Sequence, residues 1–174
     1  CIRDRLSSLT FAACVVDAHG AFLRGATLCT FDLRRDGIRE LAGWLERERI
    51  TVVHTITTIF RELVARLAPD DRLGHLRVLN TGGEATFASD AAKLFAHTND
   101  GAIFVNHLAS TEVHVIAQQA FARGDTAREE AILPVGAPPE GVEVRIRHDD
   151  GSEAGPGEVG TIVVSSRHAS PGYW

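Results

Sequence analysis

Short apolar segments alternate with helical segments through most of the chain, and this alternation restricts the fold more than any other feature. Residues 26–31, 50–54, 76–80 and 102–106 form short apolar runs that are typical of buried strands. The intervening segments are long enough for crossover helices, so the pattern predicts successive β-α-β units. Such units build a parallel sheet with right-handed crossovers, whose ligands bind beyond the carboxyl ends of the strands.

Three predicted helices link these strands. The segment 57–67 places apolar residues at spacings of three and four, which is the pattern of a helix with one buried face, and Pro69 follows its end. Asp36 and Ser89 are of the residue types preferred at helix N-caps, so we expect them to begin the other two helices. The fold class is therefore α/β, a parallel sheet flanked by helices.

The character of the sequence changes near residue 133. Apolar and charged residues alternate over 142–146, Asp and Gly at 150–151 predict a turn, and 160–165 is apolar again. We expect an α/β subdomain over 1–132 and the start of an antiparallel, β-barrel-like subdomain over 133–174. The second unit would be truncated.

Composition and charge exclude several classes of protein. The net charge of -5 and the lack of a Lys/Arg block give no basis for binding nucleic acid or an anionic membrane, and no apolar run approaches the ~20 residues of a membrane-spanning helix. Three widely spaced cysteines fit small apolar residues in a reducing compartment, so we expect a cytoplasmic protein. Because the chain contains no Met, we do not expect Cys1 to be a natural start.

Polar residues follow three of the predicted strands. They are His54, the segment 80–84 and the segment 106–112. Because the carboxyl ends of parallel strands meet at one edge of a sheet, we expect these residues, distant in sequence, to line a common crevice.

Two of these segments allow both a functional and a structural interpretation. Gly82 and Gly83 could let a planar or phosphate-bearing ligand approach the backbone, or could form a turn that needs positive φ. Thr111 and Glu112 could hold phosphate and Mg²⁺, since magnesium takes few carboxylates together with substrate phosphates. Alternatively, Ser110 and Thr111 form a helix cap or a turn. The residues alone leave both pairs of alternatives open.

The chain has eight histidines, but they do not have the spacing of a zinc site. His54, His107 and His114 show neither an i, i+4 pair nor an accompanying Cys pair. We interpret His54 and His107 as residues that line a pocket or are satisfied in the core.

Five segments in a fixed order resemble the adenylation domains of nonribosomal peptide synthetases, within the superfamily that includes acyl-CoA synthetases and luciferases. Together they span nearly the whole chain. They are residues 9–11 with 20–26, Gly82-Gly83-Glu84, the segment 106–112 ending in Thr111-Glu112, the segment 133–138, and 157–160 with 171–174.

The resemblance implies a nucleotide site that uses ATP/AMP and Mg²⁺. Thr111 would contact the α-phosphate, and Glu112 would bind the metal. Leu108 stands in a segment where the family usually has a Tyr that stacks on adenine, so that stacking, worth ~1 kcal/mol, is absent. The implied cofactor-binding residues are Gly82, Gly83, Glu84, Asn106, His107 and Leu108.

The resemblance also implies an acyl pocket. Ala12 stands where the family has an Asp that pairs with an α-amino group, and an unpaired buried ammonium would cost several kcal/mol. An ordinary α-amino acid is therefore not expected, and an aryl, hydroxy or otherwise unusual carboxylic acid is. The implied pocket residues are Ala12, Ala13, Val16, His54, Asn80, Gly82, His107, Val115 and Ile116.

The implied reaction converts a carboxylic or amino acid and ATP into an acyl adenylate, whose acyl group passes to the phosphopantetheine thiol of a partner carrier protein. An acyl-CoA ligase is one alternative, and a degenerate adenylation-like domain with a scaffolding role is another. The family's upstream phosphate loop, its ribose-binding Asp and its C-terminal lid are not found in the sequence. The isolated chain is therefore expected to be inactive and to need the remaining segments of a parent synthetase.

Overall fold

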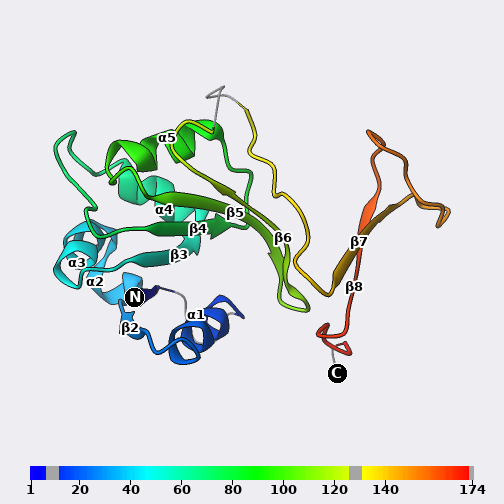
Figure 1. The fold of residues 1–174 in the computed structure, drawn as a ribbon, viewed down its shortest axis with the longest axis horizontal. Helices are drawn as coiled ribbons and strands as arrows, with labels where there is room; N and C mark the ends of the chain where they lie inside the picture. Colours follow the sequence, from blue (N-terminus) through cyan, green and yellow to red (C-terminus); the bar gives the residue numbers. More distant parts are fainter. Residues whose placement is uncertain (7–11, 126–130, 173–174) are drawn as a thin grey trace.

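A computed structural model describes residues 1–6, 12–125 and 131–172 of the chain (Figure 1). Eight strands, five α-helices and one 3-10 helix are assigned in this part of the chain. In chain order they are β1 (Ile2–Arg5), α1 (Ala12–Phe22), β2 (Thr27–Thr30), α2 (Leu33–Asp36), η1 (Ile38–Glu40), α3 (Leu41–Arg47), β3 (Val52–Ile56), α4 (Thr57–Val64), β4 (Val78–Gly82), α5 (Ala88–Ala96), β5 (Ile103–Ser110), β6 (His114–Phe121), β7 (Val142–Arg147) and β8 (Thr161–Ser166).

The main sheet has six strands in the order β2-β1-β3-β4-β5-β6. All neighbouring strands are parallel except β5 and β6, which are antiparallel. The α/β class and the parallel sheet expected from the sequence are confirmed. Strands β1 and β6 were not predicted, and they add one internal strand and one edge to the sheet.

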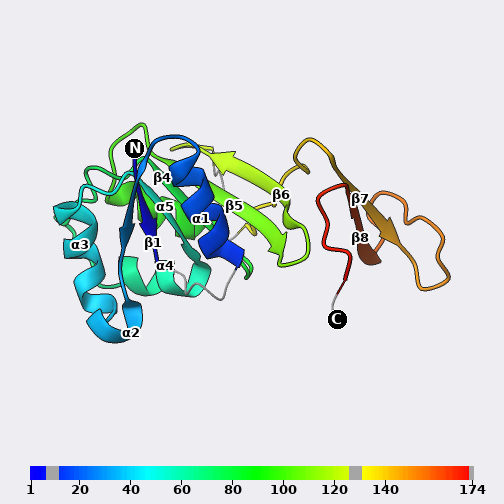
Figure 2. The same cartoon turned by 90° about the horizontal axis from the view of Figure 1, so that it is seen from below.

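Helices cover both faces of this sheet. Helices α4 and α5 lie on one face and α1 lies on the other (Figures 1 and 2). The face under α4 and α5 carries the apolar core, in which Val53, Leu79 and Phe104 from three adjacent strands are all fully buried. Phe60 of α4 packs edge-to-face on Phe104, with ring centroids 5.7 Å apart.

Two predicted helix caps are wrong. Asp32, in an extended conformation, caps α2 by accepting bonds from the amides of Arg34 and Arg35, whereas Asp36 is the last residue of that helix. Ser89 lies inside α5. The carboxylate of Asp90 instead accepts a bond from the Phe87 amide at 2.9 Å, which satisfies a donor at the start of that helix.

Two strands extend further than the sequence predicted. Strand β4 continues through Gly82, and β5 continues to Ser110. Residues 106–110 therefore lie within a strand rather than after one, because β6 returns antiparallel and pairs with β5 as far as Ser110. Only Thr111–Val113 form the turn between them.

Strands β7 and β8 form a separate two-stranded antiparallel sheet beside the main one (Figure 1). The predicted antiparallel pairing of this segment is confirmed. The division into subdomains 1–132 and 133–174 and the barrel-like continuation stay predictions.

The three cysteines differ in their exposure to solvent. Cys14 is buried, Cys29 is partly exposed and Cys1 is exposed, and all three carry free thiols. Among the described residues, no helix is both long and apolar enough to cross a membrane.

Candidate functional site

Three polar side chains from adjacent strands lie next to one another on the α1 face of the sheet. His54 of β3 is in register with Asn80 of β4, and Gly82 of β4 is in register with His107 of β5. Side chains alternate between the faces of a strand, so His54, Asn80 and His107 share the face opposite Val53, Leu79 and Phe104. The structure thus brings the ends of the three predicted strands together.

Glycine is required at positions 82 and 83 for different structural reasons. A Cβ at Gly82 would collide with the backbone oxygen of His107 and would lie 2.9 Å from its Nε2 atom. Gly82 therefore makes room for the His107 ring. Gly83 has φ of +90°, a left-handed conformation that favours glycine, so the turn interpretation applies to this residue.

His54 is held from behind by a buried ionic network. Its Nδ1 lies 2.9 Å from Oδ1 of Asp17 in α1, and Asp17 also forms an ion pair with Arg3 of β1 at 2.9 Å. The Asp17 side chain is fully buried, and an unpaired buried charge would be costly, so Arg3 is an essential counter-ion. Together these contacts fix the His54 ring in place.

Asp4 lies beside this network. Its carboxylate is fully buried and accepts a bond from the backbone amide of His54 at 2.8 Å. Burial raises the pKa of Asp4 well above its usual value, and the Asp17 charge adds to this rise. Burial therefore favours the neutral form of Asp4, whereas Asp17 has the Arg3 guanidinium as a direct counter-ion.

His107 is positioned by Asn80. Its Nδ1 lies 2.7 Å from the side-chain oxygen of Asn80, and its ring meets the ring of His54 edge-on with centroids 5.3 Å apart. Burial lowers the pKa of His107 to about 4, and the neighbouring His54 adds to this effect. His107 is neutral at physiological pH, and Nδ1 carries its proton because the Asn80 oxygen can only accept.

These side chains open into a cavity of about 240 Å³. Helix α1 supplies an apolar wall, β3 to β5 supply the polar floor, and the β5–β6 turn lies at one end. The lining residues are Ala12, Ala13, Val16, His54, Asn80, His107, Ala109, Ser110, Thr111, His114 and Val115. Eight of them were predicted as site residues: Ala12, Ala13, Val16, His54, Asn80, His107, Thr111 and Val115.

Other predicted residues lie outside the lining. Asn106 is buried on the opposite face of β5, where its amide donates to the carbonyls of Leu133 and Pro134 at 3.0 and 3.2 Å. Glu84 is exposed and accepts a bond from Thr58 of α4 at 2.5 Å.

Four further predicted residues are also absent from the lining. Gly82 is buried beneath the His107 ring, Gly83 is exposed, Leu108 is partly buried in β5, and Ile116 is buried in β6. The functional roles proposed for all these residues stay predictions.

The turn between β5 and β6 carries the two residues expected to act on phosphate. Thr111 is exposed at the cavity, and Glu112 is partly buried, with its backbone oxygen accepting a bond from the Ser170 amide at 2.8 Å. In the described part of the chain, no three His, Cys, Asp or Glu side chains gather in a metal-binding group. The donor set at the turn, one carboxylate and one hydroxyl, therefore fits Mg²⁺ only when phosphate oxygens and water complete the coordination.

The network behind His54 was not predicted from the sequence. Arg3, Asp4 and Asp17 are charged residues in segments for which we predicted no strand or helix. The pattern of α1 contained the missing information, because Cys14, Asp17 and Ala21 fall on one buried helical face. A single carboxylate on an otherwise small apolar face indicates a buried partner.

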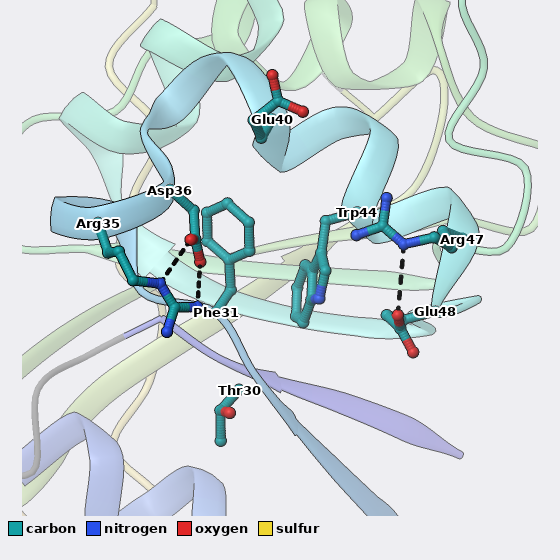
Figure 3. A pocket seen from close by; sticks show the side chains of 8 residues that line it. All are labelled: Thr30, Phe31, Arg35, Asp36, Glu40, Trp44, Arg47 and Glu48. Atoms are coloured by element: carbon teal, nitrogen blue, oxygen red, sulfur yellow. Dashed lines mark hydrogen bonds and ion pairs between the residues drawn. The ribbon is translucent and has the colours of Figure 1, made fainter.

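A second cavity, of about 420 Å³, is lined by residues of β2, α2 and α3 and their connections, and by none of the predicted site residues (Figure 3). Its floor is formed by Phe31 and Trp44, whose ring centroids are 5.0 Å apart. Arg35 already pairs with Asp36, and the side chain of Arg47 pairs with Glu48 (Figure 3). Its cations are neutralised by neighbours at the surface, so we place the functional site in the smaller cavity.

An open α/β sheet with helices on both faces and a cavity beside its strands is the architecture in which doubly wound proteins bind ligands. Comparison with known proteins makes the class specific. The model of the family described as AMP-binding enzyme matches residues 6–174. The chain belongs to this family.

The relatives include nonribosomal peptide synthetases. Tyrocidine synthase 2 of Brevibacillus parabrevis is 29% identical over 97% of this chain. A probable non-canonical nonribosomal peptide synthetase, CymA of Salinispora arenicola, is 30% identical over 97%. The chain spans only 4% and 2% of these proteins, respectively. It is thus similar to one part of much longer proteins.

Solved structures agree with this assignment. CmiS6 superimposes with a TM-score of 0.85 at 26% identity, over 99% of this chain and 42% of that one. Holo-PA1221, described as a nonribosomal peptide synthetase protein containing adenylation and PCP domains, superimposes with a TM-score of 0.79 at 26% identity, over 99% of this chain and 29% of that one. The chain has the fold of part of an adenylation domain.

Proposed function

We propose that this chain forms the acid-binding part of an enzyme that activates a small carboxylic acid as its acyl adenylate and transfers the acyl group to a carrier-protein thiol. The observation that carries the proposal is the cavity, where a small polar and apolar pocket ends at Thr111, beside Glu112. At about 240 Å³ the cavity lies below the ~300–1,000 Å³ of sites for drug-sized ligands, which favours a small acid.

In this proposal the acid lies between α1 and the floor of the cavity with its carboxylate toward the β5–β6 turn. A carboxylate oxygen attacks the α-phosphorus of ATP, and the bond to pyrophosphate breaks as pyrophosphate leaves. The chain contributes by positioning: α1 and His54 orient the acid, while the Thr111 hydroxyl donates to an α-phosphate oxygen. Catalysis of this type depends on alignment and on stabilising charge.

Glu112 would hold magnesium together with the nucleotide. When bound, the metal would neutralise negative charge on the phosphates. The tight turn after β5 fixes the direction of Thr111 and Glu112, and the bond from Ser170 to the Glu112 carbonyl anchors this turn to the segment after β8. The chain's own part is therefore to present one hydroxyl and one carboxylate on a braced turn.

The second half of the proposed reaction needs a thiol partner. Holo-PA1221 contains adenylation and PCP domains in one protein, which supports phosphopantetheine on a carrier protein as the acceptor. Supplying the adenylating protein with either coenzyme A or a phosphopantetheinylated carrier separates this proposal from an acyl-CoA ligase. We expect the thioester on the carrier; efficient formation of a coenzyme A thioester would favour the ligase instead.

The first half of the reaction is tested by acid-dependent exchange of pyrophosphate into ATP in the full-length protein. We expect exchange with small carboxylic acids, and a loss of roughly 10²-fold in Glu112→Ala. Glu62→Ala, which removes an exposed carboxylate of α4, serves as the matched control and is expected to keep full activity. Exchange that is unchanged in Glu112→Ala would exclude the proposed metal ligand, and a full-length protein that activates no acid would refute the function.

A further inference from the structure

We propose that Arg61 of α4 is a positioning residue for the nucleotide, because it holds in place the loop 83–87 that connects β4 to α5. The inference rests on the proposed function and adds to it a residue that lies outside the cavity. Three features support it: the contacts of Arg61 with this loop, the place of the loop at the edge of the sheet, and the contrast with a second arginine at the other end of α5.

Arg61 contacts the middle of the loop directly and its end through Asp90. Its Nη2 donates to the backbone oxygen of Ala85 at 2.9 Å. Its Nε and Nη2 also donate to the two carboxylate oxygens of Asp90 at 3.0 and 2.6 Å, and Asp90 accepts a bond from the Phe87 amide at 2.9 Å. The guanidinium lies over the Phe87 ring, 5.6 Å from its centroid. One side chain of α4 therefore restrains both halves of the loop.

The start of the loop is held from α4 as well. Glu84 accepts a hydrogen bond from the Thr58 hydroxyl at 2.5 Å, and its other carboxylate oxygen lies 3.9 Å from Nη1 of Arg61. Glu84 is exposed, so solvent screens this long ion pair. Asp90 is only 2% exposed, and charge-assisted bonds at a buried group are stronger. The Arg61–Asp90 pair thus provides most of the restraint on the loop.

The loop lies at the edge of the sheet where ligands of such folds bind. It follows Gly82, which is in register with His107 of β5, and its residues 83–85 are exposed. A small acid fills the cavity of about 240 Å³, so in the proposed function the nucleotide lies outside it. Strand β5 continues for three residues after His107, so the turn with Thr111 lies roughly 10 Å further along. A nucleotide can place its phosphate at that turn and its nucleoside at the loop.

A loop that contacts only the nucleoside affects binding rather than chemistry. Such contacts are equal before and during the attack on the α-phosphorus, because the nucleoside does not change in the reaction. Release of the loop therefore raises KM for ATP and leaves kcat nearly unchanged. A merely structural role has the opposite signature, since unfolded molecules lower the apparent kcat while the folded ones keep their KM.

Arg123 makes contacts of the same kind at the other end of α5. It lies over the ring of Phe95, 5.6 Å from the centroid, and donates to the backbone oxygens of Phe95 and Thr98. It also pairs with Asp100 at 3.2 Å, and its side chain is 41% exposed against 34% for Arg61. Arg123 is therefore a matched control that contacts the end of α5 instead of the loop before it.

The test compares Arg61→Lys with Arg123→Lys in the full-length protein. Lysine keeps a positive charge beside Asp90, but it cannot make the paired bonds to the carboxylate and the bond to Ala85 at once. We expect Arg61→Lys to raise KM for ATP in pyrophosphate exchange, and Kd for AMP in calorimetric titration, by roughly 10-fold. kcat and KM for the acid should change by less than about 3-fold. Arg123→Lys should leave all four constants within about 2-fold.

Hydrogen exchange measures the same restraint without catalysis. In Arg61→Lys the amides of 83–87 should exchange roughly 10-fold faster than in the unaltered protein, including the Phe87 amide that donates to Asp90. In Arg123→Lys the faster exchange should appear at the end of α5 instead. Saturating AMP should slow exchange at 83–87 in the unaltered protein.

Thr58→Val remains informative if Arg61→Lys does not fold. Thr58 is exposed, so loss of its hydroxyl has little effect on stability but releases Glu84. We expect KM for ATP to rise about 3-fold with kcat unchanged.

A fall in kcat with unchanged KM and Kd in Arg61→Lys would overturn the inference, because it would show a purely structural role. Equal effects of the two lysine variants would overturn it too, as would a full-length protein that does not bind AMP. Activation of no acid by a protein that binds AMP would instead refute the proposed function, and Kd for AMP would still decide the role of Arg61.

Discussion

The two faces of the six-stranded sheet differ in chemistry although they belong to the same strands. On the α4–α5 face, adjacent strands contribute fully buried apolar side chains at 53, 79 and 104. The α1 face carries His54 and Asn80, each one residue after the apolar residue of its strand, and His107, three residues after Phe104. The period of two in a strand therefore lets one short segment serve stability on one side and binding on the other.

Polar groups also occur under α4, but they are used differently. Thr57 bonds to Thr81 and Thr86 at 3.2 and 3.3 Å, so these buried hydroxyls satisfy one another. On the α1 face, by contrast, each imidazole uses Nδ1 for a neighbouring side chain, Asp17 or Asn80, and its other nitrogen is left for the cavity. The comparison indicates that a polar side chain with an unused hydrogen-bonding atom facing a cavity belongs to a binding site. Polar side chains that bond only to one another serve the structure.

The largest expected effect comes from the apolar face. Phe104→Ala should lower the free energy of unfolding by about 3–5 kcal/mol, because Phe104 is fully buried against Phe60. Ile103→Ala, one residue earlier and 38% exposed, should cost about 1 kcal/mol or less. Urea unfolding measures both. Similar losses in the two variants would contradict the division of the sheet into a structural and a functional face.

Sequence patterns predicted the parts of the fold that depend on apolar burial. The helix beginning at Thr57 and the β3–β4–β5 order followed from spacing alone, and that order brought His54, Asn80 and His107 together. Strand β1 was missed because three of its four residues are charged, a composition typical of the surface. It is internal only because β2 and β3 pair on either side of it.

The electrostatic part of the site was beyond sequence analysis for a related reason. The Arg3–Asp17–His54 contacts join residues 14 and 37 positions apart, and no local period encodes such pairing. The length of β5 was also missed, since its end is set by pairing with β6 rather than by its own residues. Long-range pairing of polar groups thus accounts for most of what the sequence did not predict.

Gly82→Ala tests the close approach between β4 and the His107 ring. A Cβ at this buried position meets the His107 backbone oxygen, which cannot move without disturbing the β4–β5 pairing, so we expect a loss of about 1–3 kcal/mol in unfolding free energy. Gly43→Ala in α3 is the control. Nothing lies within 4 Å of its added methyl, and a stabilisation of about 0.5–1 kcal/mol is expected. A neutral Gly82→Ala would show that the ring is not held at this distance.

Acidification should weaken the α1 face through His107. The unfolded ring takes up a proton near pH 6.5 but the folded ring only near pH 4, so the contribution of the neutral ring is complete above pH 6.5 and is lost as the pH falls toward 4. The loss should be about 1–2 kcal/mol after allowance for solvent screening of a half-buried ring. Unfolding of the chain and of His107→Gln at pH 7 and pH 4 measures it. Parallel pH dependence in the two proteins would refute the assignment.

The smallest effect is expected from the hydroxyl groups of Thr57, Thr81 and Thr86, which bond to one another. Thr81→Val keeps the shape of a fully buried side chain and removes one partner of Thr57, which retains its bond to Thr86 at 3.3 Å. The cost should be about 1 kcal/mol or less, with pyrophosphate exchange by the full-length protein unchanged. Altered acid preference in this variant would break the comparison, because Thr81 lies between Asn80 and Gly82 but faces the other side of the sheet. If preference is unchanged, chemical selection is confined to one face, and only the side chains directed toward α1 decide which acid is bound.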